Sequence, residues 1–385
     1  MSPRPKDNFC LIEISNDSVR ALKLTRLGNE LVFRDFFSES KPYDLAGFIK
    51  KLKIGDDSGV LFLYNDDLAA TFFGGVRLGK GNCDDVITEG DFDFFLNTAV
   101  HQFFGRFRNE AVRKIAADDI NIVLANSRLF NIKLDGHPVL NPVGLTAKFA
   151  EVEMEHTYIS RLISETVEES FPKNKHVLHI ESAGAISDVA GTIYPNGKLI
   201  VANVRKQKTR LLSLNNKMKY MGPVSLPRLQ FVGELGWGSE NITTALTEKF
   251  GINENNSWQI MRRYGNGELS GRAEAEIKKA IEPEVRTFHE ETSRIIEAGG
   301  TVAVFSDAPF LSGHRKIQSL DYEPVSFDGL KRYFGLNVSM PPFFDRKALS
   351  PVYLAGFIAY FERMCDNYYN ASNKYAKWLM PESSR

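Results

Sequence analysis

The chain has 385 residues, with 48 basic and 48 acidic side chains and therefore no formal net charge. At roughly 100–200 residues per domain this length predicts two to four domains, and a hydrophobic share of 43% supports packed cores and excludes a disordered chain. The balanced charge argues against a nucleic-acid partner held by bulk electrostatics, so we expect none.

Cysteine usage and hydropathy indicate the compartment. Cys10, Cys83 and Cys365 are odd in number and far apart, which favours a reducing environment without a disulfide framework. No CxxC, HExxH or clustered-histidine pattern predicts a metal site. The N-terminal MSPRPKDN is no signal peptide, and the longest apolar stretch, residues 351–361, is far below the roughly 20 residues that span a bilayer. We therefore expect a cytoplasmic protein, which could also lie at the inner face of the cell membrane.

The first predicted element is a hairpin over residues 9–24, FCLIEISNDSVRALKL. Two apolar, β-forming runs flank the polar turn Ser15-Asn16-Asp17-Ser18, which is typical of a β-hairpin. The N–H groups of such a turn can form an anion-binding nest, so these four residues are candidate phosphate contacts. The alternative is a plain solvent-facing turn, and the absence of glycine favours it for this stretch taken alone.

The elements that follow alternate between strands and helices. The helix over residues 92–108 carries an aromatic stripe, which could be a ligand or partner face but whose helical spacing is more typical of a core. A β-rich block then spans residues 118–159, with a turn at Asp135-Gly136 and a tight loop at residues 141–144. The other predicted strands are 30–37, 59–63, 69–78, 120–124, 128–134 and 147–156, and the other predicted helices are 45–52 and 160–170.

The segment 132–160, IKLDGHPVLNPVGLTAKFAEVEMEHTYIS, resembles the FtsA family of bacterial actin-like cell-division proteins. Asn141, Pro142, Val143, Gly144 and Leu145 match the family's NPVG(L/M) stretch residue by residue. Further segments resemble the family in the expected order, with a patchy region over residues 177–210. These segments are 231–250, 255–265, 277–296, 301–320 and 334–361.

This resemblance implies an α/β, actin-like (ribonuclease H-like) fold of two lobes that bind ATP between them, with a small α+β subdomain inserted in the first lobe. The expected division is 1–66 for the start of the first lobe and 67–170 for the inserted subdomain. Residues 171–365 then form the second lobe, with its helical subdomain and a return to the first lobe, and 366–385 form a C-terminal tail.

The resemblance also implies three nucleotide loops, and the first has changed. The family's first hairpin reads roughly DIGT.KV, where this chain has residues 13–19. Glu13 replaces the aspartate and Ser15 the glycine. Asp17 adds a negative charge where phosphates would sit, and two like charges ~4 Å apart repel by about 4 kcal/mol at an effective dielectric constant of ~20.

The family's second hairpin reads DIGGGTTD, and we place it at residues 213–218, so that Asn215, Asn216 and Lys217 are its candidate contacts. A rival register places it at residues 179–184. Neither register keeps the glycine triplet, and the preferred one lacks the carboxylates that would position magnesium or water. Lys217 could hold a phosphate, although a lone lysine in a turn is usually solvated.

The adenosine loop, TGGG…LPG in the family, aligns with residues 305–313 and makes Ser306, Asp307 and Ala308 candidate contacts. Only Gly313 remains of that pattern. Gly236 and Gly238 could let backbone approach a nucleotide. The interpretation that we rank higher is that they turn a strand into a helix near residue 239, which the Ser239 hydroxyl or the Asn241 amide would cap. Arg263, in the segment that resembles AE.IK..YG, completes the set of candidate contacts.

The joint change of all three loops predicts a pseudo-ATPase without catalytic residues, in which ATP and magnesium are cofactors only if the altered loops still bind. The expected function is an FtsA-like scaffold of the cell-division machinery at the septum. Its partners would be the tail of a tubulin-like filament or membrane division proteins, and it would self-associate into an oligomer or filament. The alternatives are a PilM-like cytoplasmic scaffold of type IV pilus assembly and an active actin-like ATPase.

The C-terminal tail, NYYNASNKYAKWLMPESSR, bears on membrane contact. Its aromatic residues with Lys374 and Lys377 could form a short surface helix ended by Pro381. Two lysines contribute only roughly 1 kcal/mol each toward anionic lipid. We therefore favour the alternative, in which this stretch is the end of the last domain helix.

Overall fold

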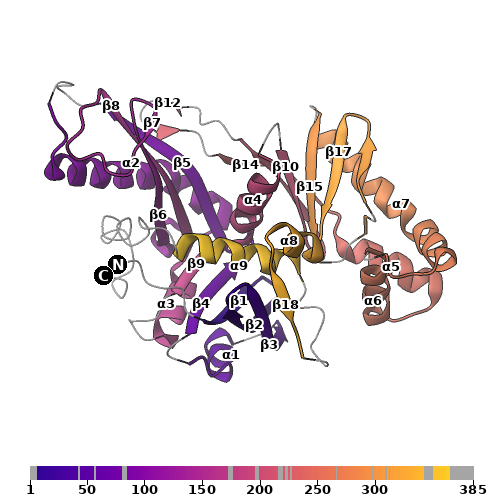
Figure 1. Cartoon of the computed structure of the whole chain (residues 1–385). Helices are drawn as coiled ribbons and strands as arrows, with labels where there is room; N and C mark the ends of the chain where they lie inside the picture. The colour runs from indigo at the N-terminus through magenta and orange to yellow at the C-terminus, as the bar shows by residue number, and fades with distance from the viewer. Residues whose placement is uncertain are drawn as a thin grey trace.

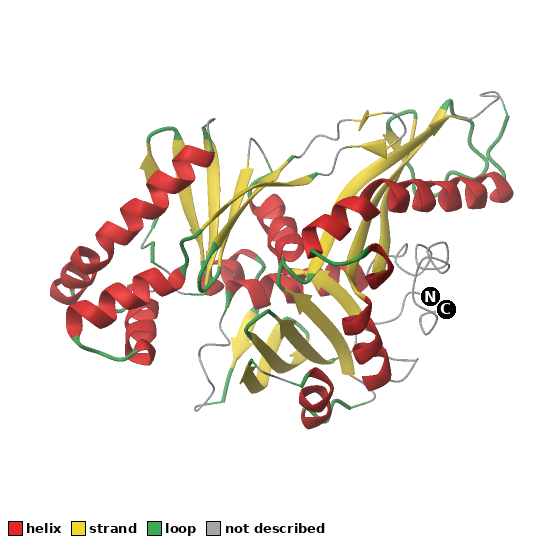
Figure 2. Ribbon diagram, turned by 180° about the vertical axis from the view of Figure 1, so that it is seen from behind, coloured by secondary structure: helices red, strands yellow, loops and turns green. Residues whose placement is uncertain are grey.

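The computed structural model describes residues 7–41, 44–55, 58–79, 85–171, 177–195, 199–215, 220–221, 224–225, 228–265, 267–296, 299–307, 310–311, 313–341 and 350–364. Within these ranges the strands form three sheets, two of which belong to lobes joined side by side while the third extends outward with one long helix along it (Figures 1 and 2). The predicted tail, residues 366–385, lies outside the described residues.

The sheet of the first lobe has the order β18-β3-β2-β1-β4-β9. β1 and β2 pair antiparallel with Ile14 opposite Val19, which confirms the predicted hairpin, and β4 and β9 add in parallel. One face of the sheet packs against α1 and α3, and the other packs against α4 and α9. The bounds are β1 Asn8–Ile14, β2 Ser18–Leu27, β3 Glu30–Ser40, β4 Ser58–Tyr64, β9 Val177–Glu181, β18 Asn337–Ser339, α1 Leu45–Lys51, α3 Arg161–Ser170, α4 Ser182–Ile193 and α9 Pro351–Met364.

The sheet of the second lobe has the order β14-β11-β10-β15-β17-β16. Its inner face shares the core of α4 and α9, and its outer face packs under α5 and α7 around Trp237 and Phe288. The bounds are β10 Leu199–Val204, β11 Thr209–Leu214, β14 Leu229–Leu235, β15 Gly300–Ser306, β16 Arg315–Ile317, β17 Leu320–Val325, α5 Ser239–Phe250, α6 Glu254–Gly265, α7 Gly271–Ile295 and α8 Phe327–Tyr333.

The third sheet has the order β12-β13-β5-β8-β6-β7. Its strands β5 to β8 lie between β4 and β9 in sequence, and we call them, with α2, the inserted subdomain; β12 and β13 join the sheet from residues 220–225, outside the expected range 67–170. The helix α2 covers one face of this sheet and buries Phe103 and Phe107, so this part of the aromatic stripe is core, as its spacing favours, whereas Phe92 and Phe95 at its start are half-buried and line a pocket. The two strands expected at 120–124 and 128–134 form one long strand, β6, interrupted by bulges. The bounds are β5 Ala69–Gly79, β6 Ile122–Leu134, β7 His137–Pro138, β8 Phe149–Ser160, β12 Tyr220–Met221, β13 Val224–Ser225 and α2 Glu89–Ile115. A 3-10 turn, Asp119–Asn121, lies between α2 and β6.

The two lobe sheets repeat one topology. Each has a central hairpin (β1–β2 and β10–β11), a third antiparallel strand beside it (β3 and β14), and two parallel strands on the other side (β4–β9 and β15–β17). The pair α4–α9 packs between the sheets (Figure 1). This duplication brings the turns of the two central hairpins to the same cleft. No helix in the described part of the chain is long and apolar enough to cross a bilayer.

Candidate functional site: the cleft between the lobes

The turn of the first hairpin, residues 15–18, is closed by its own hydrogen bonds. The Ser15 N–H donates to the Ser18 carbonyl (2.9 Å), and the Ser18 N–H donates to Ser15 Oγ (3.1 Å). Ser15 Oγ donates to Asp17 Oδ1 at 2.6 Å, and although burial opposes ionisation, this bond helps to hold the pKa of Asp17 below its usual value. Asn16 Nδ2 donates to Asp67. The turn therefore presents the Asp17 carboxylate, and the N–H groups of Ser15 and Ser18 are already paired within it.

The second hairpin turn is residues 205–208, Arg205-Lys206-Gln207-Lys208, between β10 and β11. Both registers expected for it are therefore wrong. Residues 213–214 end β11 at the opposite end of the strand, where the Asn215 N–H donates to the Arg228 carbonyl, and Asn216 and Lys217 lie outside the described residues. Residues 179–184 form the junction of β9 and α4. A glycine pattern cannot locate this turn, because the turn is basic and includes no glycine.

Gly238 supports that basic turn. A Cβ atom on Gly238 would lie 2.4 Å from the carbonyl oxygen of Lys206 and 2.5 Å from that of Arg205. The first N–H groups of α5, those of Ser239 and Glu240, donate to these carbonyls at 2.9 and 2.8 Å, so they are not open to a phosphate. Asn241 Oδ1 accepts from the Gly238 N–H, which confirms the capping role that the glycine pattern favours. Gly236, by contrast, is exposed and has open space around it.

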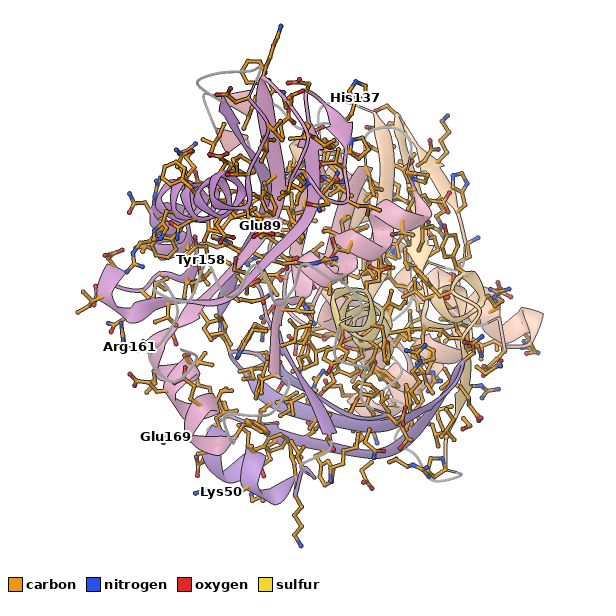
Figure 3. All side chains as sticks on the ribbon, turned by 60° about the vertical axis from the view of Figure 1, so that its left-hand side comes forward. Lys50, Glu89, His137, Tyr158, Arg161 and Glu169 are labelled. Carbon is orange, nitrogen blue, oxygen red and sulfur yellow. The ribbon has the colours of Figure 1, made fainter. Side chains whose placement is uncertain are left out.

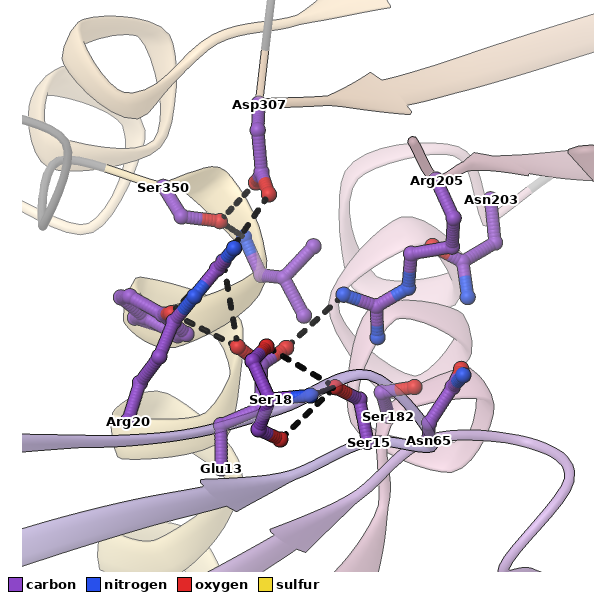
Figure 4. Close-up of polar contacts among 12 residues, drawn as sticks. Glu13, Ser15, Ser18, Arg20, Asn65, Ser182, Asn203, Arg205, Asp307 and Ser350 are labelled. Carbon is purple, nitrogen blue, oxygen red and sulfur yellow. Dashed lines mark hydrogen bonds and ion pairs between the residues drawn. The ribbon is translucent and has the colours of Figure 1, made fainter. Parts of the chain in front are cut away.

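Arg205 crosses the cleft and binds Glu13 of the first lobe (Figure 4). Its Nη1 atom lies 2.9 Å from Glu13 Oε1, and Glu13 Oε2 accepts from the Tyr353 hydroxyl of α9 at 2.7 Å. Arg20 of β2 lies 3.5 Å from the same carboxylate. Burial opposes the charge on Glu13, but Arg205 and Arg20 outweigh it and hold the pKa of Glu13 below its usual value.

Two neighbouring aspartates after β4 extend this bridge between the lobes. Asp66 is buried and accepts from Ser182 Oγ (2.8 Å), from the Ala183 N–H (3.1 Å) and from Asn203 Nδ2 of β10 (3.0 Å). Asp67 pairs with Lys208, at 2.8 Å, and with Arg210. Every one of these contacts except those of Ser182 and Ala183 joins the first lobe to the second.

The adenosine loop contributes a further carboxylate, that of Asp307, to the contacts around the cleft. Asp307, directly after β15, accepts from the Ser350 hydroxyl at the start of α9 and lies 4.0 Å from Arg20 (Figure 4). Ser306 is buried at the end of β15, and Ala308 lies outside the described residues. The structure thus brings the turn 15–18, Ser306 and Asp307 of the predicted set toward one cleft, but Asp307 binds the protein itself.

The charges of the cleft do not suit a polyanion. The cations of the second turn and of β11 already have carboxylate partners: Arg205 pairs with Glu13, Lys206 with Glu240 and Glu254, and Lys208 and Arg210 with Asp67 and Glu234. Asp17 adds a carboxylate in the first turn, and Asp307 lies 4.0 Å from Arg20. A triphosphate placed here would have to compete with these carboxylates for the cations.

A small pocket of about 130 Å³ adjoins the adenosine loop, between Gly265, Ser306 and Ser326. Phe310 and Leu311 of that loop are buried, and the Phe310 ring packs 5.0 Å from Trp237 and 5.2 Å from Phe288. Ligand pockets commonly measure roughly 300–1,000 Å³, so this space is small for a nucleoside. Arg263 lies on the exposed side of α6 and does not line the pocket.

Glu181, where β9 ends, is a buried carboxylate at the base of the inserted subdomain. It accepts from the Thr71 N–H of β5 and pairs with Lys114 of α2. Burial raises the pKa of Glu181 to about 7, in spite of Lys114. Because the pKa in the folded state lies above the ordinary 4.5, folding favours the protonated form. The stability from this group is present at low pH and is lost as the pH rises through about 7.

Replacing Glu181 with glutamine should remove this pH dependence. Glutamine keeps an oxygen acceptor for the Thr71 N–H and cannot ionise. As the pH rises from about 5 to about 8, the free energy of unfolding of the wild type should therefore fall by on the order of 2 kcal/mol relative to that of the variant. Urea unfolding at both pH values measures the difference. Glu169→Gln on α3, an exposed position, is the control. An equal decline in wild type and Glu181→Gln would show that Glu181 does not cause it.

Two copies of one strand order, with their hairpin turns facing each other across a cleft, define the actin-like class of α/β proteins, and this confirms the expected fold class. No protein-family model matches the chain, and no curated protein matches it. The assignment to the FtsA family and the expected cell-division role therefore gain no support beyond the fold.

Solved structures do match the chain over most of its length. It is similar to the PilM-PilN type IV pilus biogenesis complex, with 14% identity and a TM-score of 0.44 over 92% of this chain and 97% of that chain. It is also similar to the activator of 2-hydroxyisocaproyl-CoA dehydratase from Clostridium difficile with bound ADPNP (8% identity, TM-score 0.33, 94% and 98%). A third is the ethanolamine utilization protein EutJ from Carboxydothermus hydrogenoformans (10% identity, TM-score 0.32, 92% and 91%).

Sequence reasoning missed the residues that hold the cleft together. The family pattern marks Glu13 only as a replaced aspartate, and it marks none of Asp66, Arg205 and Tyr353. One signal could have found Arg205, because residues 199–214, LIVANVRKQKTRLLSL, repeat the pattern of the first hairpin: an apolar run, a four-residue polar turn and a second β-forming run.

Proposed function

We propose that this protein is an actin-fold scaffold that works through protein partners and does not bind ATP in its interlobe cleft. The observation that carries the proposal is the Arg205–Glu13 ion pair, which joins the two hairpin turns where ATP-binding members of the fold hold phosphates. A second support is Asp307, which is held by Ser350 where the family that the sequence resembles has a bare glycine loop.

The cleft also offers little for catalysis. Glu13 and Asp66 are the carboxylates best placed to hold magnesium or to orient water, but Arg205 and Tyr353 bind the first, and Asn203 and Ser182 bind the second. Opening either group to a metal would break a buried contact between the lobes. An active ATPase is therefore the less favoured function.

Mg-ATP should leave the melting temperature of the full chain unchanged within about 1 °C at millimolar concentration. A ligand present at ~100 times its dissociation constant adds about 2.7 kcal/mol of stability, so binding in the micromolar range would give a clear shift. Differential scanning fluorimetry with Mg-ATP, Mg-ADP and magnesium alone makes the measurement. A saturable shift that depends on both nucleotide and magnesium would refute the closed cleft.

The resemblance in sequence leaves two kinds of scaffold. A PilM-like role in type IV pilus assembly implies a protein partner, because the similar solved structure is a complex of PilM with PilN. An FtsA-like role in division implies a protein partner and self-association of the scaffold. Of the two we take the pilus role as the working proposal. Deletion of the gene should then abolish surface pili and leave cell length unchanged, whereas long undivided cells would point to division. Sedimentation of the purified chain tests self-association separately.

A further inference from the structure

The start of α4 connects the first lobe to the inserted subdomain. Glu181, the last residue of β9, is buried, and its carboxylate accepts from the Thr71 N–H of β5 and pairs with Lys114 of α2. The next residue, Ser182, donates its hydroxyl to Asp66 at 2.8 Å, and Asp66 is also buried. The two carboxylates, those of Glu181 and Asp66, are therefore close enough to repel each other.

Asp66 is the one of these two carboxylates that also contacts the second lobe. Its Oδ2 atom accepts from Asn203 Nδ2 of β10 at 3.0 Å. Burial opposes the charge on this carboxylate, but Arg205, Lys114 and Arg210 outweigh it and hold its pKa below the usual value for aspartate. Arg205 and Arg210 belong to the second lobe, whereas Lys114 belongs to α2. Two of these three cations would therefore move away with the second lobe when the cleft opens.

Glu181 depends on Lys114 for its counter-charge. Burial raises the pKa of Glu181, Lys114 lowers it, and the neighbouring Asp66 raises it again. The Lys114 side chain is 28% exposed, whereas that of Glu181 is fully buried. A lysine ammonium is a compact charge at the end of a flexible chain, so it can move between two acceptors while their backbone stays in place. Lys114 thus has two discrete positions, one at each carboxylate, and elements of this kind can couple distant sites.

α2 carries Lys114 in its last turn. The helix has 27 residues and runs from this end along the inserted subdomain to its far tip (Figure 1). The base of the subdomain packs Ala69, Val123 and Ile159 into a core of the first lobe, so a change of partner at this lysine would tilt the subdomain and not detach it. Asn97 lies about 25 Å along α2 from Lys114, and a tilt of about 10° would move it by about 4 Å.

We infer that Lys114 couples the interlobe cleft to the orientation of the inserted subdomain by exchanging Glu181 for Asp66. In the closed cleft the cations of the second lobe compensate Asp66, and Lys114 pairs with Glu181. When the second lobe moves away, Asp66 keeps its charge and attracts Lys114, so the end of α2 moves toward the end of β4 and the subdomain tilts. This coupling goes beyond the proposed scaffold function and does not rest on which partner the scaffold binds.

Double electron–electron resonance on the full chain tests the coupling. Asn97 on α2 and Lys50 on α1 are exposed, and replacing both with p-acetylphenylalanine allows spin labelling that leaves the native cysteines untouched (Figure 3 shows Lys50). Arg205→Met is made together with Glu13→Gln, which removes the carboxylate that the lost arginine would leave unpaired. In this double variant the distance between the labels should differ from that in the wild type by at least about 3 Å.

The change in distance should require both groups that exchange. Adding Asp66→Asn to the double variant should return the distance to within about 1 Å of the wild type, because no carboxylate then competes for Lys114. In a Lys114→Met background the double variant should produce no change. Glu13→Gln with Lys206→Met is the matched control, because Lys206 lies next to Arg205 in the same turn but is half exposed and should leave the distance unchanged.

Arg210→Met gives a second, independent test, because it removes the other cation that the second lobe provides for Asp66. It should change the distance in the same direction. An unchanged distance in these variants, when circular dichroism shows that they are folded, would overturn the inference. So would a change that persists after Asp66→Asn or in the Lys114→Met background. A change of the same size in the Lys206→Met control would also overturn it, since the cause would then be a deformed turn.

Discussion

Replacing Arg205 with methionine is expected to lower the free energy of unfolding by about 3 kcal/mol, although the side chain lies in a turn. The physical reason is the carboxylate that it leaves behind, because Glu13 is buried and keeps only Arg20, at 3.5 Å, and the Tyr353 hydroxyl. Removing one partner of a buried ion pair typically costs about 3–5 kcal/mol, and the remaining partners reduce that cost. Urea unfolding at pH 7, followed by circular dichroism, measures the loss.

Lys206→Met is the matched control for this variant. Lys206 lies next to Arg205 in the same turn, but its amine is half exposed and pairs with Glu240 and Glu254 at 3.5 and 3.3 Å. Exposed pairs are worth about 0–1 kcal/mol, so the control should stay close to the wild type. The double variant Glu13→Gln with Arg205→Met should recover most of the lost stability. If Arg205→Met and Lys206→Met lowered the free energy of unfolding equally, the loss would come from a change in the turn and not from the broken ion pair with Glu13.

The same ion pair should also affect how the free energy of unfolding changes as the pH falls below neutral. The pKa of Glu13 is lowered in the folded protein, so its contribution is present above the unfolded value near 4.5 and is lost as the pH falls through the folded value. Without Arg205 the folded pKa of Glu13 rises, and the difference in stability between wild type and Arg205→Met should shrink toward low pH. A difference that stayed constant from about pH 7 to about pH 4 would mean that Glu13 is not the group responsible.

Much of the fold could be predicted because it depends on local patterns. The first hairpin, α1 and β5 follow from apolar alternation and helical spacing, and the core role of the aromatic stripe on α2 follows from its period. The long β6 was divided in two, since its bulges interrupt the alternation that marks a strand. Pairing between distant segments, such as Val224 of β13 with Val76 of β5, leaves no local signal.

The site was predicted less well than the fold, for a physical reason. The family pattern consists of glycines and carboxylates at fixed spacings, and its glycines let the backbone approach the nucleotide. In this chain, ion pairs between side chains lie where the family has that exposed backbone. Asp66 and Asn203 are 137 residues apart in sequence and meet only because the ends of β4 in the first lobe and β10 in the second face each other across the cleft. Asp17 and Asp307 could be selected because they replace residues of a known motif, whereas Tyr353 replaces nothing recognisable.

Gly238→Ala is expected to cost about 3 kcal/mol, and the neighbouring Gly236→Ala almost nothing. The new methyl group on residue 238 would stand 2.4 and 2.5 Å from two backbone carbonyl oxygens, which cannot rotate away as a side chain would. Forcing a methyl group into a packed site costs about 1–3 kcal/mol, and displacing the turn also weakens the hydrogen bonds from Ser239 and Glu240. Gly236 has open space, and its φ angle is not positive, so alanine fits there.

The two costly variants should be coupled, because both act on the turn that carries Arg205. If Gly238→Ala moves the turn away from α5, it also withdraws Arg205 from Glu13, so part of its cost is the broken ion pair. Combining it with Arg205→Met should then cost less than the sum of the single variants by about 1 kcal/mol or more, as is usual for residues that share one network. Strict additivity would mean that Gly238 supports the start of α5 alone, and that the closed cleft depends on Arg205 without help from the turn behind it.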